Sequence, residues 1–131
     1  MDKPMPNHLL LDANIIVRLA VADHPEHFEK AQQLFSRIER GQIQAYLMDM
    51  IIAEIIYVLF KVYGYSRSDV ARTVRLVLKY EHITVDNPAL VYRALELFES
   101  ARIDFADAML CARKQLEGYE VASFDKKVLG C

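Results

Sequence analysis

The sequence predicts an α/β fold, built as one domain of three α/β/α layers around a central, mostly parallel sheet of about four to five strands. Short apolar or alternating stretches, which suit strands, recur between longer stretches whose apolar residues have helical spacing. The chain has 131 residues, which is enough for one domain and too few for two ordinary ones. We therefore expect a single domain over residues 1–131.

Composition narrows the class of protein. Hydrophobic residues make up 53% of the chain and charged residues 26%, so a packed core is expected rather than disorder. The net charge of -2 argues against a protein that holds nucleic acid mainly by phosphate attraction, but fits a nuclease that grips its substrate through metal ions. Cys111 and Cys131 give no disulfide framework, so a reduced cytoplasm is the simplest setting. Residues 48–62, the most apolar window, carry charges and are too short to span a membrane.

The first predicted strand is the leucine run at residues 9–11, which ends at Asp12. An apolar run bounded by polar residues suits a strand buried on both faces, and a buried helix segment is the alternative that the run leaves open. Ligands of open α/β sheets bind at the carboxyl ends of the strands, so Asp12 is a candidate for chemistry. Residues 13–21, apolar apart from Asn14 and Arg18, predict a short helix packed on the sheet.

A second helix is predicted to begin at residues 23–26, with Asp23 as its cap, and to end at Gly41. His24 and His27 have a spacing that metal ligands also show, but solvated first-turn residues are the commoner case. Residues 43–47 alternate polar and apolar side chains and predict a strand.

The helix predicted over residues 51–60 is apolar except for Glu54. A helix that is apolar all round must be covered on all sides, and a second subunit could supply part of the cover. An ionised Glu54 in that setting costs several kcal/mol unless it is paired or bound to a metal. A salt bridge to a residue such as Arg18 and a functional role are equally open.

The middle of the chain continues the alternation of helices and strands. Gly64 ends the apolar helix, and Ser66 begins a helix that runs to about Lys79. Residues 83–85 predict a short β-branched strand. Residues 87–88, Asn-Pro, begin the next helix as its cap and first position.

Two aspartates stand three residues apart where the last long helix is predicted to begin. That spacing places Asp104 and Asp107 on one face near the helix N-terminus. Ordinary capping is the simpler explanation for Asp104, whereas Asp107 lies a full turn inside and is the better functional candidate. The helix ends at Gly118, and a last strand over residues 119–123 leads to Asp125.

Four carboxylates, those of Asp12, Glu54, Asp107 and Asp125, could thus meet at the carboxyl edge of the sheet, since right-handed crossovers return each strand to it. Clustered carboxylates repel and raise one another's pKa values, and a divalent cation removes that conflict. Mg²⁺ and Mn²⁺ prefer such oxygen ligands. One ion, or two about 4 Å apart, could activate a water and stabilise charge on a phosphodiester. No histidine or cysteine has a zinc-like spacing within this set.

These motifs, in this order, resemble the acidic signature of the PIN-domain ribonucleases, and most closely the small prokaryotic VapC-type toxins of toxin–antitoxin pairs. The resemblance is carried by residues 9–14, Glu54, residues 104–108 and residues 123–125. It implies metal-binding roles for Asp12, Glu54, Asp107 and Asp125, and supporting roles for Asn14, Asp104 and Ser123. It also implies Mg²⁺- or Mn²⁺-dependent cleavage of RNA, a homodimer and inhibition by an antitoxin protein.

We hypothesise that Asp12 and Asp107 hold the principal ion, that Glu54 acts as a ligand or water-orienting base, and that Asp125 binds the same ion or a second one. A metal-bound water would attack phosphorus. The candidates to contact flanking phosphates are Arg18, Lys126 and Lys127. The chain ends six residues after Asp125, so we expect a further edge strand to be short or missing.

Two other classes of function stay open. One is a PIN-like domain that only binds a partner, which has no need of a metal. The other is a phosphoacceptor domain of the response-regulator kind, although the first strand ends in a single acid and Asp86 lies where helix capping explains it. The RNA class, the cleaved sequence and the number of ions are not set by the sequence.

Overall fold

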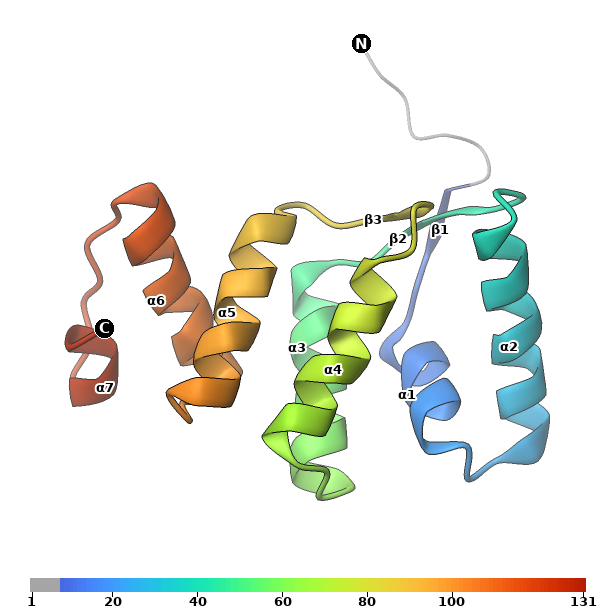
Figure 1. Cartoon of the computed structure of the whole chain (residues 1–131), viewed down its shortest axis with the longest axis horizontal. Helices are drawn as coiled ribbons and strands as arrows, with labels where there is room; N and C mark the ends of the chain where they lie inside the picture. Colours follow the sequence, from blue (N-terminus) through green and yellow to red (C-terminus); the bar gives the residue numbers. More distant parts are fainter. Residues whose placement is uncertain (1–7) are drawn as a thin grey trace, which may run out of the picture.

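The chain folds as an α/β domain with a parallel sheet, as its sequence predicts (Figure 1). The structure is a computed structural model and describes residues 8–131. Its strands are β1 (His8–Leu10), β2 (Gln44–Tyr46) and β3 (Ile83–Thr84), in the order β1-β2-β3. Both pairings are parallel, so all three carboxyl ends lie at one edge of the sheet.

The helices stand side by side in a row (Figure 1). α2 packs on α1, α1 on α3, α3 on α4, α4 on α5 and α5 on α6. No helix within residues 8–131 is long and apolar enough to cross a membrane. The elements are α1 (Ala13–Val21), α2 (Pro25–Glu39), α3 (Asp49–Tyr57), the π-helix η1 (Val58–Val62), α4 (Arg67–Leu78), α5 (Pro88–Ser100), α6 (Phe105–Glu117) and α7 (Lys126–Leu129).

Side-chain caps explain where several helices begin. Ser66 and Asn87 each accept a backbone N–H from three residues further on, at 3.0 and 3.2 Å, and so cap α4 and α5 as predicted. The prediction of Asp23 as the cap of α2 is wrong. His24 takes that position, because the Asp23 carboxylate is instead bound by the guanidinium of Arg18 at 2.8 Å.

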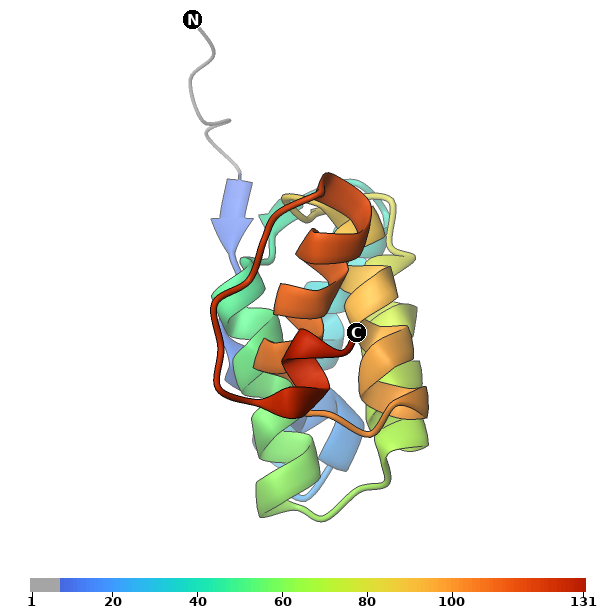
Figure 2. The same cartoon turned by 90° about the vertical axis from the view of Figure 1, so that its left-hand side faces the viewer.

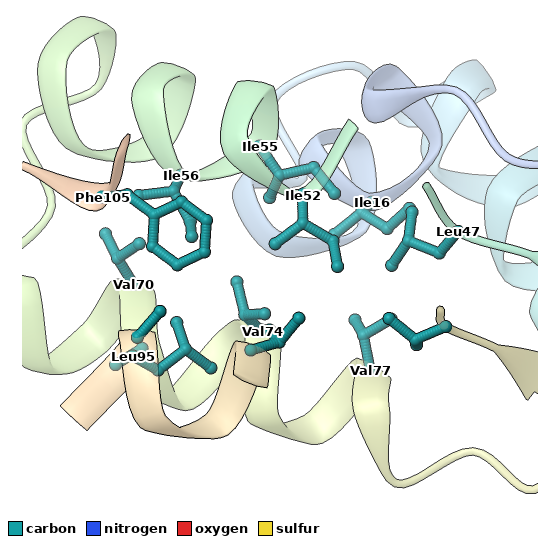
Figure 3. Close-up of a cluster of buried hydrophobic side chains, with 14 of the residues drawn as sticks. Ile16, Leu47, Ile52, Ile55, Ile56, Val70, Val74, Val77, Leu95 and Phe105 are labelled. Carbon is teal, nitrogen blue, oxygen red and sulfur yellow. The ribbon is translucent and has the colours of Figure 1, made fainter. Parts of the chain in front are cut away.

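The core lies between α3 on one side and α4 and α5 on the other (Figure 3). On α3, Ile52 and Ile56 point into this core, together with Phe105 from the first turn of α6. The chain itself therefore covers most of the apolar side chains of the helix predicted over residues 51–60. The other face of this helix is not covered by the chain itself, since Tyr57 is 61% exposed there, and cover by a second subunit stays a prediction.

The sheet has three strands within the described residues, fewer than the four to five expected. The difference lies at residues 119–123, which form no strand pairing. Figure 2 shows the chain after α6 returning alongside that helix to α7. No side chain of this segment is fully buried, and Tyr119 is 60% exposed. Packing of the buried Val128 and a covalent link to α6 hold the end of the chain instead.

That link is a disulfide between Cys111 of α6 and Cys131, with a sulfur–sulfur distance of 2.09 Å. It corrects the expectation that the two cysteines stay unlinked. The sequence separation of 20 gave no sign of the pairing, because it depends on the chain turning back along α6. The bond ties α7, which follows Asp125, to the helix that carries Asp107.

We expect loss of this disulfide to lower the free energy of unfolding by about 3 kcal/mol, because it closes a loop of some 20 residues in the unfolded chain. The measurement is thermal melting with and without a reductant. Cys131→Ser should melt like the reduced wild type and should not respond to the reductant. Identical melting of the oxidised and reduced wild type would contradict the prediction.

Candidate active site

The first turn of α6 presents two carboxylates. Asp104 occupies the N-cap position with an extended backbone, but its side chain makes no capping hydrogen bond. The backbone carbonyl of Asp104 accepts the first helical bond from Ala108 at 2.8 Å. The explanation of the Asp104 side chain as an ordinary cap is therefore wrong, and its carboxylate is available for another role.

Asp107 lies in an unfavourable position for a negative charge. Burial raises the pKa of the Asp107 carboxyl, and the nearby charges of Asp125 and Asp104 raise that pKa further. The helix N-terminus favours a carboxylate at this position, whereas burial and the neighbouring acids oppose it. Asp104 and Asp125 thus lie near enough to Asp107 for their charges to act on it, and we call these three residues, at the starts of α6 and α7, the acidic cluster.

Asp125 is held by its own turn. One of its carboxylate oxygens accepts the backbone N–H of Lys127 at 2.8 Å, so Asp125 caps the short helix α7. The hydroxyl of Ser123 accepts the backbone N–H of Asp125 at 2.9 Å. The predicted supporting residue Ser123 therefore orients Asp125 through its backbone, while Lys126 and Lys127 lie exposed just beyond.

Asp12 lies where the sequence places it, just after the carboxyl end of β1. It is exposed, and one carboxylate oxygen accepts the backbone N–H of Ala13 at 2.7 Å as the cap of α1. Asn14, two residues after Asp12, is also exposed and lines a groove between α1 and α2.

Glu54 is exposed on α3, so the expectation that its charge is buried is wrong. It also has no salt bridge to Arg18. The Arg18 guanidinium donates to Asp23 at 2.8 Å and to the Tyr63 hydroxyl at 3.4 Å. Arg18 therefore stabilises the turn after α1. Glu54 faces solvent on α3, and α3 packs against α6.

The predicted acids are brought together only in part. The acids that act on the pKa of Asp107 are Asp125 and Asp104, and Asp12 and Glu54 are not among them. Within the described residues, no three aspartate, glutamate, histidine or cysteine side chains are arranged so that they could hold a metal ion. The type of donor nevertheless suits a hard divalent cation, because every donor is a carboxylate oxygen. A bound cation would also offset the repulsion between Asp107 and its acidic neighbours.

Arg67 is a residue that sequence reasoning missed. Its guanidinium donates to the backbone carbonyls of Phe98 and Ile103, at 2.7 and 2.8 Å. It also lies 4.7 Å from the ring centroid of Phe60 and 4.6 Å from that of Phe98. These contacts anchor the turn that leads into Asp104. In the sequence, Arg67 is only the residue after a helix cap, and no local pattern indicates its long-range partners.

A second pair of acids lies at the carboxyl ends of β2 and β3. Burial raises the pKa of Asp49, and the charge of Asp86 adds to the effect. One Asp49 carboxylate oxygen is buried with no hydrogen-bond partner among the described residues. Asp86 accepts a hydrogen bond from the Tyr46 hydroxyl, while Asn87 caps α5. The capping interpretation of this turn is confirmed, with Asn87 rather than Asp86 as the cap.

The arrangement of a parallel sheet, helical crossovers and acids after β1, on α3, on α6 and before α7 agrees with a family comparison. The model of the PIN domain matches residues 9–129, so the chain belongs to the PIN domain family. It is also similar to a VapC ribonuclease of Aquifex aeolicus (strain VF5), with 23% identity over 119 residues. That match covers 90% of this chain and 87% of the relative.

Proposed function

We propose that this chain is a divalent-metal-dependent endoribonuclease and the toxin of a toxin–antitoxin pair. The observation that carries the proposal is the acidic cluster of Asp104, Asp107 and Asp125, in a chain of the PIN domain family. The similarity to a protein named a ribonuclease supports RNA as the substrate. Asp12 and Glu54 belong to the proposed site through their places after β1 and on α3.

Mg²⁺ or Mn²⁺ is the proposed cofactor, as one ion or two, because all the acids offer oxygen donors. Asp12, Glu54, Asp107 and Asp125 would hold it, and Asn14, Asp104 and Ser123 would support them. When bound, the ion would supply a water of lowered pKa and would offset charge on the phosphodiester. The chain's own acids would orient the reacting groups, and the neighbouring negative charges of Asp104 and Asp125 would favour a cation beside Asp107.

The phosphates on either side of the cleaved bond need cations to bind them. Lys126 and Lys127 are exposed beside Asp125 and suit this role. Arg18 is the third candidate, but it would first have to release Asp23, to which it is bound at 2.8 Å. We therefore assign the larger contribution to the two lysines.

A homodimer and an antitoxin partner complete the proposal. Exposed apolar side chains such as Leu10 and Met50, which are 67% and 75% exposed, offer surface for such partners. Sedimentation at micromolar concentration measures the oligomeric state directly. A chain that stays monomeric would contradict the dimer while leaving the ribonuclease proposal unchanged.

The proposed activity is tested by incubating the purified protein with a mixed RNA pool in Mg²⁺, in Mn²⁺ and in EDTA. We expect cleavage with either metal and none in EDTA, because the acids need a cation to act. Failure to cleave under any condition, together with no metal binding in calorimetry, would favour a PIN-like domain that only binds a partner. Cleavage that persists in EDTA would contradict the metal dependence.

A further inference from the structure

A groove of about 250 Å³ opens beside the acidic cluster. One wall is the outer face of α3 and η1, the other is the first turn of α6, and Phe98 of α5 lies between them. Asp104 and Ala106 line the groove, so it reaches the residue next to Asp107. The other lining residues are Ala53, Ile56, Tyr57, Phe60, Lys61 and Phe105.

An aromatic ring and a cation meet at the outer wall of this groove. Tyr57 is 61% exposed and Lys61 lies one turn further along the same helical segment. The Lys61 ammonium lies 5.1 Å from the ring centroid of Phe60 and forms no ion pair with the residues that the structure describes. Glu54 precedes Tyr57 by three residues, so a ligand over Tyr57 would lie beside a proposed metal-binding acid.

Charged groups of both signs lie at and near the groove. The charges of Arg102 and Asp104 both act on Arg67, which shows that these three groups lie close together at the entry to α6. Lys61 adds a further cation across the groove. Lys61 and Asp104 are the charged residues that line the groove, so Lys61 is the cation that a phosphate of a bound strand can contact there.

We propose that this groove binds the nucleotide next to the cleaved phosphodiester in single-stranded RNA, with its base stacked on Tyr57 and a phosphate at Lys61. Proteins that bind single strands combine exposed aromatic rings for stacking with cations that follow the backbone. A paired base in a duplex is already stacked and cannot cover the ring. The inference rests on the proposed ribonuclease function. It adds that the bound RNA is single-stranded and that Tyr57 and Lys61 determine specificity.

The test measures fluorescence anisotropy of a short labelled single-stranded RNA of mixed sequence, in an Asp12→Asn background so that it is not cleaved. We expect Tyr57→Ala to weaken binding about tenfold, because stacking of one base contributes roughly 1–3 kcal/mol. Tyr57→Phe keeps the ring and should bind normally. Tyr119→Ala is the matched control, since Tyr119 is 60% exposed but lines a different groove.

Lys61→Ala should weaken binding at low salt and reduce the dependence of log Kd on log salt by about one. Lys30→Ala is the matched control, because Lys30 is paired with Glu26 on α2. A duplex of the same sequence should bind more weakly than the single strand and should not respond to Tyr57→Ala. Unchanged affinity of Tyr57→Ala and Lys61→Ala for the single strand would overturn the inference.

These outcomes separate the inference from the function on which it rests. If the wild type cleaves RNA with metal and neither groove variant changes RNA binding, the proposed ribonuclease function would be supported and the proposed role of the groove would be overturned. Loss of RNA binding in the groove variants of a chain that never cleaves RNA would support the groove and contradict the ribonuclease. A Tyr57→Ala variant that dissociates a dimer with its RNA affinity intact would make the groove a protein interface and overturn the inference.

Discussion

Asp107→Asn is expected to reduce RNA cleavage about 100-fold or more at saturating Mn²⁺. Asp107 has the acid neighbours Asp104 and Asp125 and a carboxyl pKa raised by burial. A neutral amide at this position removes an anionic ligand. Replacement of residues that only support metal ligands already lowers metal affinity or activity about 10- to 100-fold. The measurement is the initial cleavage rate of the mixed RNA pool, with metal binding followed by calorimetry.

The same substitution should make the metal-free protein more stable at neutral pH. Because the folded-state pKa of Asp107 is raised above its ordinary value of 3.8, ionisation opposes folding as the pH rises through the folded pKa. The variant has no such charge, so its advantage in melting temperature should appear above about pH 4 and vanish below it. We expect a higher melting temperature than that of the wild type at neutral pH and no difference at low pH.

Asp49→Asn is the matched control for both effects. The pKa of Asp49 is also raised by burial and by a neighbouring acid, but Asp49 lies outside the proposed site. Like Asp107→Asn, this variant should melt at a higher temperature than the wild type at neutral pH but not at low pH. It should cleave RNA at the wild-type rate. Wild-type cleavage by Asp107→Asn, or an equal loss in Asp49→Asn, would contradict the role assigned to Asp107.

Phe98→Ala is expected to lower the free energy of unfolding by about 3–5 kcal/mol, as large aromatic deletions in a core do. Phe98 is 1% exposed, contacts the ring of Phe60 edge-on at 5.4 Å between centroids, and carries the Arg67 guanidinium on its face. Its loss therefore leaves a cavity and also weakens the anchor of the turn before α6.

Urea denaturation followed by circular dichroism measures this effect. Phe124→Ala removes the same ring from a fully exposed position between Ser123 and Asp125, so its free energy of unfolding should stay within about 0.5 kcal/mol of the wild type. Similar losses in the two variants would show that the core between α3 and α5 is not packed as the structure describes.

Local physics explains why much of the fold could be predicted from the sequence. The helix over residues 13–21 and the caps Ser66 and Asn87 depend on side chains within a few residues of one another. The sequence pattern and the structure agree on these elements because no distant partner decides them. The apolar run before Asp12 does form the strand β1, but the prediction that it is buried on both faces is wrong, because Leu10 is 67% exposed.

Long-range contacts explain what could not be predicted. The Cys111–Cys131 bond and the hydrogen bonds of Arg67 join segments whose approach depends on the complete fold. Residues 119–123 have the length of a strand, yet the chain there follows α6 and pairs with no strand in the described residues. Glu54 has apolar neighbours in sequence, but only the packing of α3 decides that its side chain faces solvent.

Within the candidate site, sequence order identified four acids on separate elements, and of these the structure brings only Asp107 and Asp125 close enough for the charge of one to act on the other. Asp104 joins the cluster because it makes no side-chain cap, which spacing alone does not reveal. Asp12 and Glu54 are assigned to the site by their places after β1 and on α3, and by the family to which the chain belongs.

The measurement that tests the central proposal most directly compares wild-type protein with Asp12→Asn on the mixed RNA pool, in Mn²⁺ and in EDTA. Asp12 is exposed, and Asn retains an oxygen that accepts the N–H of Ala13, so the fold should survive the change. We expect cleavage only by the wild type and only with metal. Equal cleavage by Asp12→Asn in Mn²⁺ would contradict the assignment of this acid to a metal-dependent active site.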